Sequence, residues 1–394
     1  VAMSVLKEGF GCSDEDLFEK CEFDLLTRKA LGMELLTDVT PSIDTYYLFR
    51  RRICEYQERT GFDLMQLCFE QLAGKHVHLL KISGKCVRMD SKLIGSNIAR
   101  QSRYELIHTT LVKFLKTCTL THLSPEQEER AKEYLKEDSS KTVYRSDSDT
   151  LQSNLARIGN FIMEMLAAFP ATSPAHDLLQ RLFDEQYVVM AGKAVLRDKK
   201  EVKADSLQNP NDPDATYRAK NDQKVQGYVT NITETVEEGK PNIITSVQVE
   251  TAVFADCHFL QEAVENSERV TDSTIEDLYA DGAYQSPDNR EFAKNHNAMQ
   301  LKTGKMQGGC RWELIPHDED GLTIREIATG NTYEAVKAVT KQGSRKRWRI
   351  PWNNKTGWRY FEDKDIKAYQ LRKQIESLPL EEQHKRNNVE AAMF

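Results

Sequence analysis

The sequence predicts an α/β protein built on a mixed sheet, with a helical N-terminal domain, a long helical interruption and a β-rich insertion. Two observations predict this class. Apolar residues recur at helical spacing over residues 1–75 and again over about 91–200. Short apolar runs, two of which end in Asp90 and Asp281, indicate strands between and after these helical stretches.

We expect four parts along the chain. A helical domain covers residues 1–75, and the sheet core covers 76–310, with its helical interruption at about 91–200. A β-rich basic insertion covers 311–362, and a C-terminal helix of the core that carries a third acid covers 363–394.

The composition is that of a soluble globular protein. Of 394 residues, 39% are apolar and 29% charged, and no stretch approaches the roughly 20 apolar residues that span a bilayer. No charged segment followed by an apolar one marks a secretory signal, so we expect a cytoplasmic protein without membrane contact. Because the chain opens with Val1 and runs straight into a helical pattern, we expect a fragment.

The eight cysteines are scattered, with no C-x-x-C pair and no histidine at zinc-finger spacing. We therefore expect free thiols in a reducing compartment rather than structural zinc or disulfides.

Positive charge is concentrated in one segment of a chain whose net charge is −7. Residues 341–359 contain seven basic residues, no acids and three of the four tryptophans. The basic side chains would neutralise phosphates, and the tryptophans would stack on an unpaired or flipped base. The alternative is a solvated β-hairpin whose tryptophans pack as core. The DNA contacts that we expect here are Lys341, Arg345, Lys346, Arg347, Trp348, Arg349 and Trp352.

Capping-type starts at Ser13 and Ser42 predict two N-terminal helices, and a third follows through Leu64. The second helix carries a basic cluster that either grips a DNA backbone or forms a solvated face: Arg50, Arg51 and Arg52.

The core is predicted in pieces. Residues 76–90 suggest two short strands joined at Ser83–Gly84, and helices follow to about 169. Residues 198–224 are a polar loop. Strands are expected at 225–234 and 243–254, with 238–241 as their turn. A helix to about 268, the Asp281 strand, a helix at 287–296, a strand at 299–303 and a final helix over 363–394 come next. Without the two interruptions, this order is that of a ribonuclease-H-like core.

Three acids in this order suggest a metal-dependent site. Asp90 and Asp281 end strands, and Glu390 lies on a late amphipathic segment, four residues after Arg386. Polynucleotidyl transfer uses two Mg²⁺ ions roughly 3.5–4 Å apart, with Mn²⁺ as the substitute, and these ions share carboxylates. Taken alone, an acid of this kind is more often a turn or cap residue than a metal ligand. Three other acids could be rival metal ligands but fit loop or cap roles better: Asp147, Asp149 and Asp256.

Several stretches, in order, resemble a DDE transposase of a bacterial insertion sequence. The Asp281 and Glu390 boxes are the most specific of them. The matching stretches are Gly11–Leu17, Phe23–Leu25, Pro41–Thr45, Phe49–Arg50, Met89–Ile98, Asp212–Ala215 with Lys220 and Gly227–Tyr228, Ala280–Tyr284 and Arg386–Glu390.

The resemblance implies that Asp90, Asp281 and Glu390 are the metal-binding triad. It also implies that Arg386, one helical turn before Glu390, holds a phosphate at the same site. The alternative for that pair is a surface i,i+4 ion pair. Two departures stand out: the family's signature tyrosine falls at Gln383, and its lysine would fall after Phe394, so we expect a truncated product.

The expected function is therefore Mg²⁺-dependent cleavage and strand transfer of DNA at insertion-sequence ends. The partners would be double-stranded transposon ends and target, with a homodimer assembled on the DNA. The helical domain at 1–75 would bind the ends and help to pair the subunits. The alternatives are a truncated or inactive remnant that binds DNA, and a metal-dependent nuclease without transfer activity.

Overall fold

The computed structural model describes residues 1–171, 173–220, 223–303, 310–317, 321–338, 347–352 and 357–381. The chain divides into two compact units, Val1–Leu72 and Ala73–Phe394. Its described part is mixed α/β and contains a mixed sheet.

The N-terminal unit consists of helices around a small core of Leu17, Cys21 and Tyr46. The buried Arg28 holds the loop after the third helix, because its guanidinium donates to Leu35 O at 2.8 Å and to Asp38 O at 2.9 Å. The helices are α1 (Ala2–Phe10), α2 (Asp14–Phe23), α3 (Leu25–Ala30), α4 (Ile43–Thr60) and α5 (Leu64–Leu80), which continues past the unit boundary.

The strand predicted at residues 76–80 is wrong, because these residues form the last turn of α5. Ala73 and Val77 are both buried and lie four residues apart, which is the spacing of one helical face. The helix stops where Lys81 takes a positive φ of 52°.

The central sheet has the strand order β4–β5–β1–β7–β8, and β6 also pairs with β5. Strand β5 is antiparallel to β1, β4 and β6, whereas β1, β7 and β8 run parallel. The strands are β1 (Cys86–Gly95), β4 (Thr216–Lys220), β5 (Gln223–Thr235), β6 (Ile244–Thr251), β7 (Asp277–Ala280) and β8 (Gln300–Thr303).

Strand β5 has β4 beside its first half and β6 beside its second. The change of partner falls at Gly227, whose φ is 157° and whose missing Cβ would lie 2.3 Å from Ile94 O. Only glycine fits this position. Strand β4 lies inside the stretch predicted as a loop, and β1 continues to Gly95 where a helix was predicted from Ser91.

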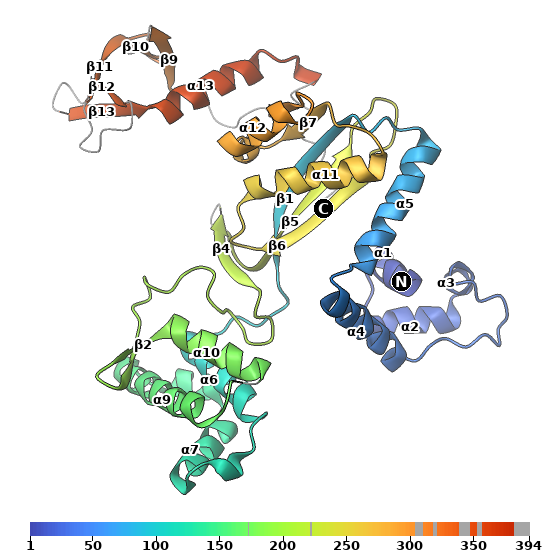
Figure 1. The fold of residues 1–394 in the computed structure, drawn as a ribbon, viewed down its shortest axis with the longest axis vertical. Helices are drawn as coiled ribbons and strands as arrows, with labels where there is room; N and C mark the ends of the chain where they lie inside the picture. Colours follow the sequence, from blue (N-terminus) through green and yellow to red (C-terminus); the bar gives the residue numbers. More distant parts are fainter. Residues whose placement is uncertain are drawn as a thin grey trace. The chain divides into compact units, whose positions relative to one another are not determined.

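One face of the sheet is covered by α11 (Leu260–Thr271), which Figure 1 shows crossing it. The apolar core beneath includes Val87, Met89, Leu260, Val264 and Leu278. The hairpin β5–β6, the helix α11 and the following β7, α12 (Pro287–Asn295) and β8 occur in the predicted order.

The interruption after β1 forms its own apolar core around α6 and α9. It ends in a two-stranded hairpin, which lies inside the stretch of about 91–200 that was predicted as a helical interruption. Its elements are α6 (Arg103–Leu115), α7 (Pro125–Lys136), α8 (Ser139–Arg145), α9 (Ser148–Ala168), α10 (Pro174–Gln186), β2 (Tyr187–Met190) and β3 (Lys193–Leu196).

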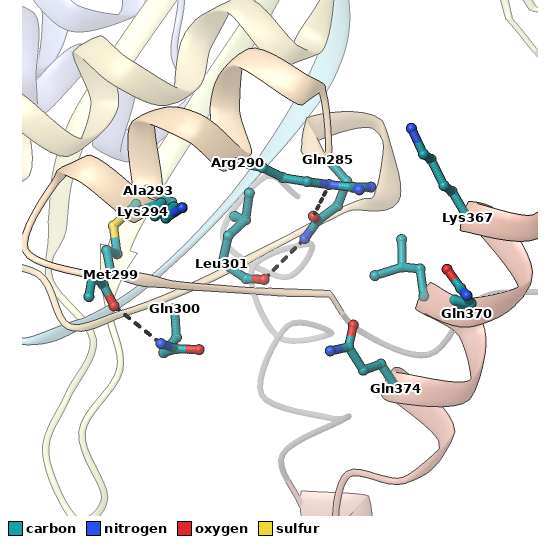
Figure 2. Close-up of a pocket in the computed structure, with 12 residues that line it drawn as sticks. Gln285, Arg290, Ala293, Lys294, Met299, Gln300, Leu301, Lys367, Gln370 and Gln374 are labelled. Carbon is teal, nitrogen blue, oxygen red and sulfur yellow. Dashed lines mark hydrogen bonds between the residues drawn. The ribbon is translucent and has the colours of Figure 1, made fainter. Parts of the chain in front are cut away.

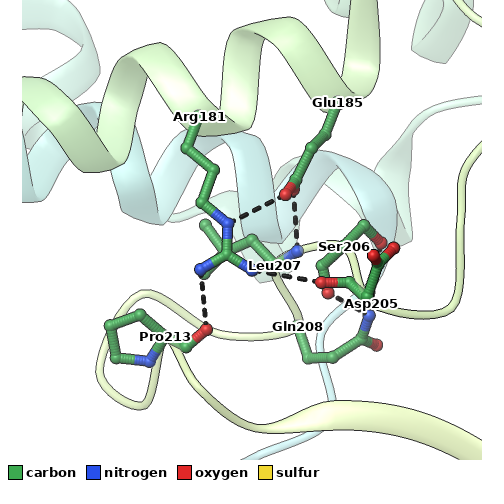
Figure 3. Close-up of polar contacts among 7 residues, drawn as sticks. All are labelled: Arg181, Glu185, Asp205, Ser206, Leu207, Gln208 and Pro213. Atoms are coloured by element: carbon green, nitrogen blue, oxygen red, sulfur yellow. Dashed lines mark hydrogen bonds and ion pairs between the residues drawn. The ribbon is translucent and has the colours of Figure 1, made fainter. Parts of the chain in front are cut away.

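A hydrogen-bonded network fastens the loop that leads from the interruption back to the sheet (Figure 3). Arg181 donates to Pro213 O at 2.9 Å and to Asp205 O at 3.1 Å, and it pairs with Glu185 at 2.8 Å. Glu185 in turn accepts from the Leu207 N–H at 2.7 Å. One ion pair on α10 therefore fixes a long polar loop at three points.

The same loop is tied to the sheet at the end of β1. The Asp212 carboxylate accepts hydrogen bonds from the Ser96 and Tyr228 hydroxyls. Asn209 Nδ2 donates to Ala99 O at 3.1 Å. The chain therefore leaves and re-enters the sheet at neighbouring positions.

A five-stranded antiparallel sheet follows β8, in the order β13–β12–β11–β10–β9. It lies where β-rich structure was predicted, and Trp312, Ile324, Trp348 and Ile350 form part of its core. The elements are β9 (Trp312–His317), β10 (Gly321–Glu326), β11 (Thr332–Lys337), β12 (Arg347–Trp352), β13 (Gly357–Glu362) and α13 (Asp363–Glu376).

A buried ion pair between Arg88 and Glu234 joins β1 to β5, with 2.6 Å between the two side chains. We expect Glu234→Ala to lower the free energy of unfolding by about 3 kcal/mol, because it leaves the Arg88 charge buried. Urea denaturation measures this loss. Lys85→Ala, which removes the exposed Lys85–Glu276 pair, is the control and should cost less than about 1 kcal/mol. Equal losses in the two variants would contradict the prediction.

Candidate functional site

Asp90 lies within β1, and Asp281 comes directly after β7, the parallel neighbour of β1 in the sheet. In the pairing of β1 with β7, Arg88 lies opposite Tyr279. Asp90 comes two residues after Arg88, and Asp281 two residues after Tyr279. The parallel register therefore brings the two aspartates to equivalent positions, although they are far apart in the sequence.

The backbone holds each carboxylate in place. Asp90 is 9% exposed, and its Oδ1 accepts from the Ser91 N–H at 2.9 Å. Asp281 is half-buried and caps the short helix η3 (Gly282–Tyr284), accepting from the Ala283 N–H at 3.0 Å. A backbone N–H therefore orients each carboxylate, as a preorganised metal ligand requires.

The Tyr284 hydroxyl is close enough to these acids for their charges to affect its pKa. Its ring is fully buried, and its hydroxyl donates to Asn231 Oδ1 at 2.9 Å. Burial raises the pKa of Tyr284 strongly, and the negative charges of Asp90, Asp256 and Asp281 raise this pKa further. Three carboxylates thus lie within electrostatic range of one hydroxyl.

Asp256 is the member of this group that sequence reasoning assigned to a loop or cap role. It opens the helix η2 (Asp256–Phe259), is 7% exposed and pairs with Arg218 of β4 at 3.0 Å. An acid just before a helix looks like an ordinary cap in the sequence. No sequence signal separates it from the other capping acids, because its proximity to the site comes from the packing of η2 beside η3.

The predicted third ligand and its arginine, Glu390 and Arg386, lie outside the described residues, as do Lys341, Arg345 and Lys346. Within the described part of the chain, no three His, Cys, Asp or Glu side chains are arranged to hold a metal ion. The site as described is therefore a pair of aspartates with Asp256 nearby.

The N-terminal arginines Arg50, Arg51 and Arg52 are exposed on α4. Arg51 pairs with Glu55 at 3.5 Å, and the Arg50 guanidinium lies 5.7 Å from the Tyr46 ring. These contacts fit a solvated face and a DNA-binding face equally well.

The basic and aromatic residues of β12 divide between the two faces of the strand. Trp348 is 4% exposed and packs in the core of the five-stranded sheet, so in this position it has no free ring face for a base. Arg347 and Arg349 lie on the other face, over the rings of Tyr360 and Trp358 at 4.0 and 4.2 Å. Trp352 is partly buried, and the Arg311 guanidinium lies 4.9 Å from its ring. Trp348 thus has the packing role that we considered as the alternative.

Comparison with protein-family models, with curated proteins and with solved structures finds no match for this chain. In the described part of the chain, no helix has both the length and the apolar character needed to cross a membrane.

Replacing Tyr284 by phenylalanine tests the buried hydroxyl. Below pH about 10, Tyr284→Phe should lower the free energy of unfolding by about 1–3 kcal/mol, because Asn231 loses its donor. The raised pKa means that folded Tyr284 keeps its proton after the unfolded chain has lost it. The wild type should therefore lose stability above pH 10 faster than the variant, by up to about 1.4 kcal/mol per pH unit.

Urea denaturation of both proteins at pH 8 and above pH 10 measures this difference. Identical pH dependence in the two proteins would contradict it.

Proposed function

We propose that this chain is a DDE-type polynucleotidyl transferase, a transposase that cuts DNA at the ends of an insertion sequence and joins those ends to a target. The observation that supports the proposal is the parallel pairing of β1 with β7, because Asp90 and Asp281 each come two residues after the paired residues Arg88 and Tyr279. Two aspartates brought together in this way are suited to activating an attacking oxygen and stabilising a leaving one through shared cations.

The strand order supports the same proposal. Three antiparallel strands (β6, β5 and β1) followed by two parallel ones (β7 and β8) are the arrangement expected of a ribonuclease-H-like core. The helical interruption enters after the first strand of this core, and the five-stranded sheet follows its last strand. These are the positions from which the insertions of such an enzyme would reach DNA.

The donors present fit a hard divalent cation. Asp90 and Asp281 offer only oxygen, which Mg²⁺ prefers, and Mn²⁺ accepts the same ligands. Bound Mg²⁺ would supply Lewis acidity to the phosphodiester and the attacking oxygen. Asp90 and Asp281 would fix the cations, Glu390 would complete the ligand set, and Arg386 would hold a phosphate oxygen.

DNA is the proposed partner. The N-terminal helices with Arg50–Arg52 would bind the element ends, and the guanidinium-bearing face of β12 would contact phosphates through Arg347 and Arg349. Joining two ends requires two active sites, so we propose a homodimer assembled on the DNA.

A metal-dependent nicking and joining assay on a labelled DNA duplex tests the proposal. Asp90→Asn and Asp281→Asn should each reduce Mg²⁺-dependent nicking about a thousandfold or more, because each removes several kcal/mol of transition-state stabilisation. Asp277→Asn is the matched control. Asp277 lies on the same strand β7 but at its other end, where it pairs with Lys302 at 2.9 Å.

The Asp277 variant should nick at a rate within about twofold of wild type. Equal activity of wild type and all three variants would contradict the assignment of the two aspartates. Nicking without joined products would identify a nuclease, and binding without nicking would identify a remnant.

A further inference from the structure

A cationic pocket of about 400 Å³ lies between α12 with β8 on one side and α13 on the other (Figure 2). Among the described residues that line it are three basic side chains, Arg290, Lys294 and Lys367, and no carboxylate. The whole chain carries more acidic than basic residues, 61 against 54. A concave surface without any acid is therefore a local departure from the composition of the protein.

The basic and amide side chains come from one face of α12 and one face of α13. Arg290 and Lys294 are four residues apart on α12, so they lie on one side of that helix. On α13, Lys367, Gln370 and Gln374 have the same spacing of three and four residues. Figure 2 shows Lys367, Gln370 and Gln374 on the side of the pocket opposite Arg290.

Most of these polar side chains have no partner among the described residues. No side-chain hydrogen bond or ion pair with a described residue is made by Lys294, Lys367, Gln370 or Gln374. Among the described residues, the Arg290 side chain has one hydrogen-bond partner: Gln285 Oε1 accepts from Arg290 Nε at 3.3 Å, and Gln285 Nε2 donates to Leu301 O at 3.1 Å. The pocket therefore presents several hydrogen-bond donors that are available to an anion.

The pocket begins close to the candidate site along the chain. Asp281 caps the start of η3, and Gln285 follows at its end, where the Gln285 N–H donates to Gly282 O at 3.2 Å. Helix α12 starts two residues later, at Pro287. An extended polyanion that reaches Asp281 would meet Gln285 and Arg290 next.

We propose that this pocket binds the sugar-phosphate backbone of a DNA strand beside the bond that is cut. The proposal rests on the proposed function, and it adds a substrate contact on α12 and α13. Lysine, arginine and glutamine side chains are the usual donors to DNA phosphates. The apolar part of the lining, including Ala293, Met299 and Leu371, suits the carbon face of deoxyribose. The basic residues are exposed and spread over two helices, which suits several phosphates rather than one free ion.

Charge removal on a single helix gives a matched test. Lys367→Gln removes a lining charge, whereas Lys373→Gln removes the same charge from α13 at a residue that pairs with Glu376 at 3.4 Å and does not line the pocket. The probe is a fluorescein-labelled DNA duplex of mixed sequence. Its affinity is measured by anisotropy over a range of salt concentrations, with Ca²⁺ in place of Mg²⁺ so that the DNA stays intact.

Each lost phosphate contact lowers the slope of log affinity against log salt by about 0.9, which is about an eightfold effect over one decade of salt. We expect this change for Lys367→Gln and for Arg290→Gln, and no change for Lys373→Gln. In a second series, a neutral methylphosphonate replaces one phosphate of the duplex at a time. At one of these positions, Lys367→Gln should cause no further change in the slope. Unchanged slopes in both lining variants, or an equal change in Lys373→Gln, would overturn the proposal.

Two further arms separate the possible sources of failure. Inorganic phosphate that competes with the duplex at micromolar concentration would identify a site for a free anion and overturn the backbone assignment. Nicking is measured separately in Mg²⁺. If the lining variants change the slope but the wild type never nicks, the pocket assignment stands and the catalytic assignment fails. If the wild type nicks and the lining variants leave the slope unchanged, the catalytic assignment stands and the pocket assignment fails.

Discussion

The pairing of β1 with β7 is the constraint on which the candidate site depends. Neighbouring strands lie about 4.8 Å apart, so residues at equivalent positions on the two strands lie close together. The ladder pairs Arg88 with Tyr279, and each aspartate comes two residues after its member of that pair. A divalent cation shared by the two carboxylates would bind both strands at this point.

A buried polar chain supports that arrangement from below. Tyr284 donates to Asn231, Asn231 Nδ2 donates to Gln248 Oε1 at 2.9 Å, and Gln248 Nε2 donates to Glu262 Oε2 at 3.1 Å. The chain links η3, β5, β6 and α11. Because each of these buried amides has a partner, the network is rigid and does not destabilise the core. The position of Asp281 is therefore coupled to the packing of α11 on the sheet.

Sequence reasoning predicted the elements whose signals are local. The hairpin β5–β6 follows from strand-forming residues on either side of a turn that contains Gly239 and Pro241. The strands near Asp90 and Asp281 follow from short apolar runs. Strand β4 was missed because its sequence, Thr216–Lys220, is polar and forms a strand only through its pairing with β5. The final turn of α5 was missed because two alternating histidines imitate a strand.

The candidate site divides in the same way. Asp90 and Asp281 could be predicted as site residues because each follows a short apolar run that is visible in the sequence, although β1 continues past Asp90 to Gly95. The placement of Asp256 and the burial of Trp348 could not, since both depend on packing between segments that are distant in the chain. Glu390 and Arg386 lie outside the described residues and stay predictions.

The junction at the end of β1 has an evolutionary consequence. Ser96 and Asp212, which bracket the helical interruption, are hydrogen-bonded to each other, and the Ser96 N–H also donates to Gln226 O at 2.9 Å. The entropic cost of closing an inserted chain between these two points grows only slowly with the number of residues inserted. A gene for such a protein can gain, lose or exchange this whole module in one recombination event, while the strands that carry the aspartates keep their register.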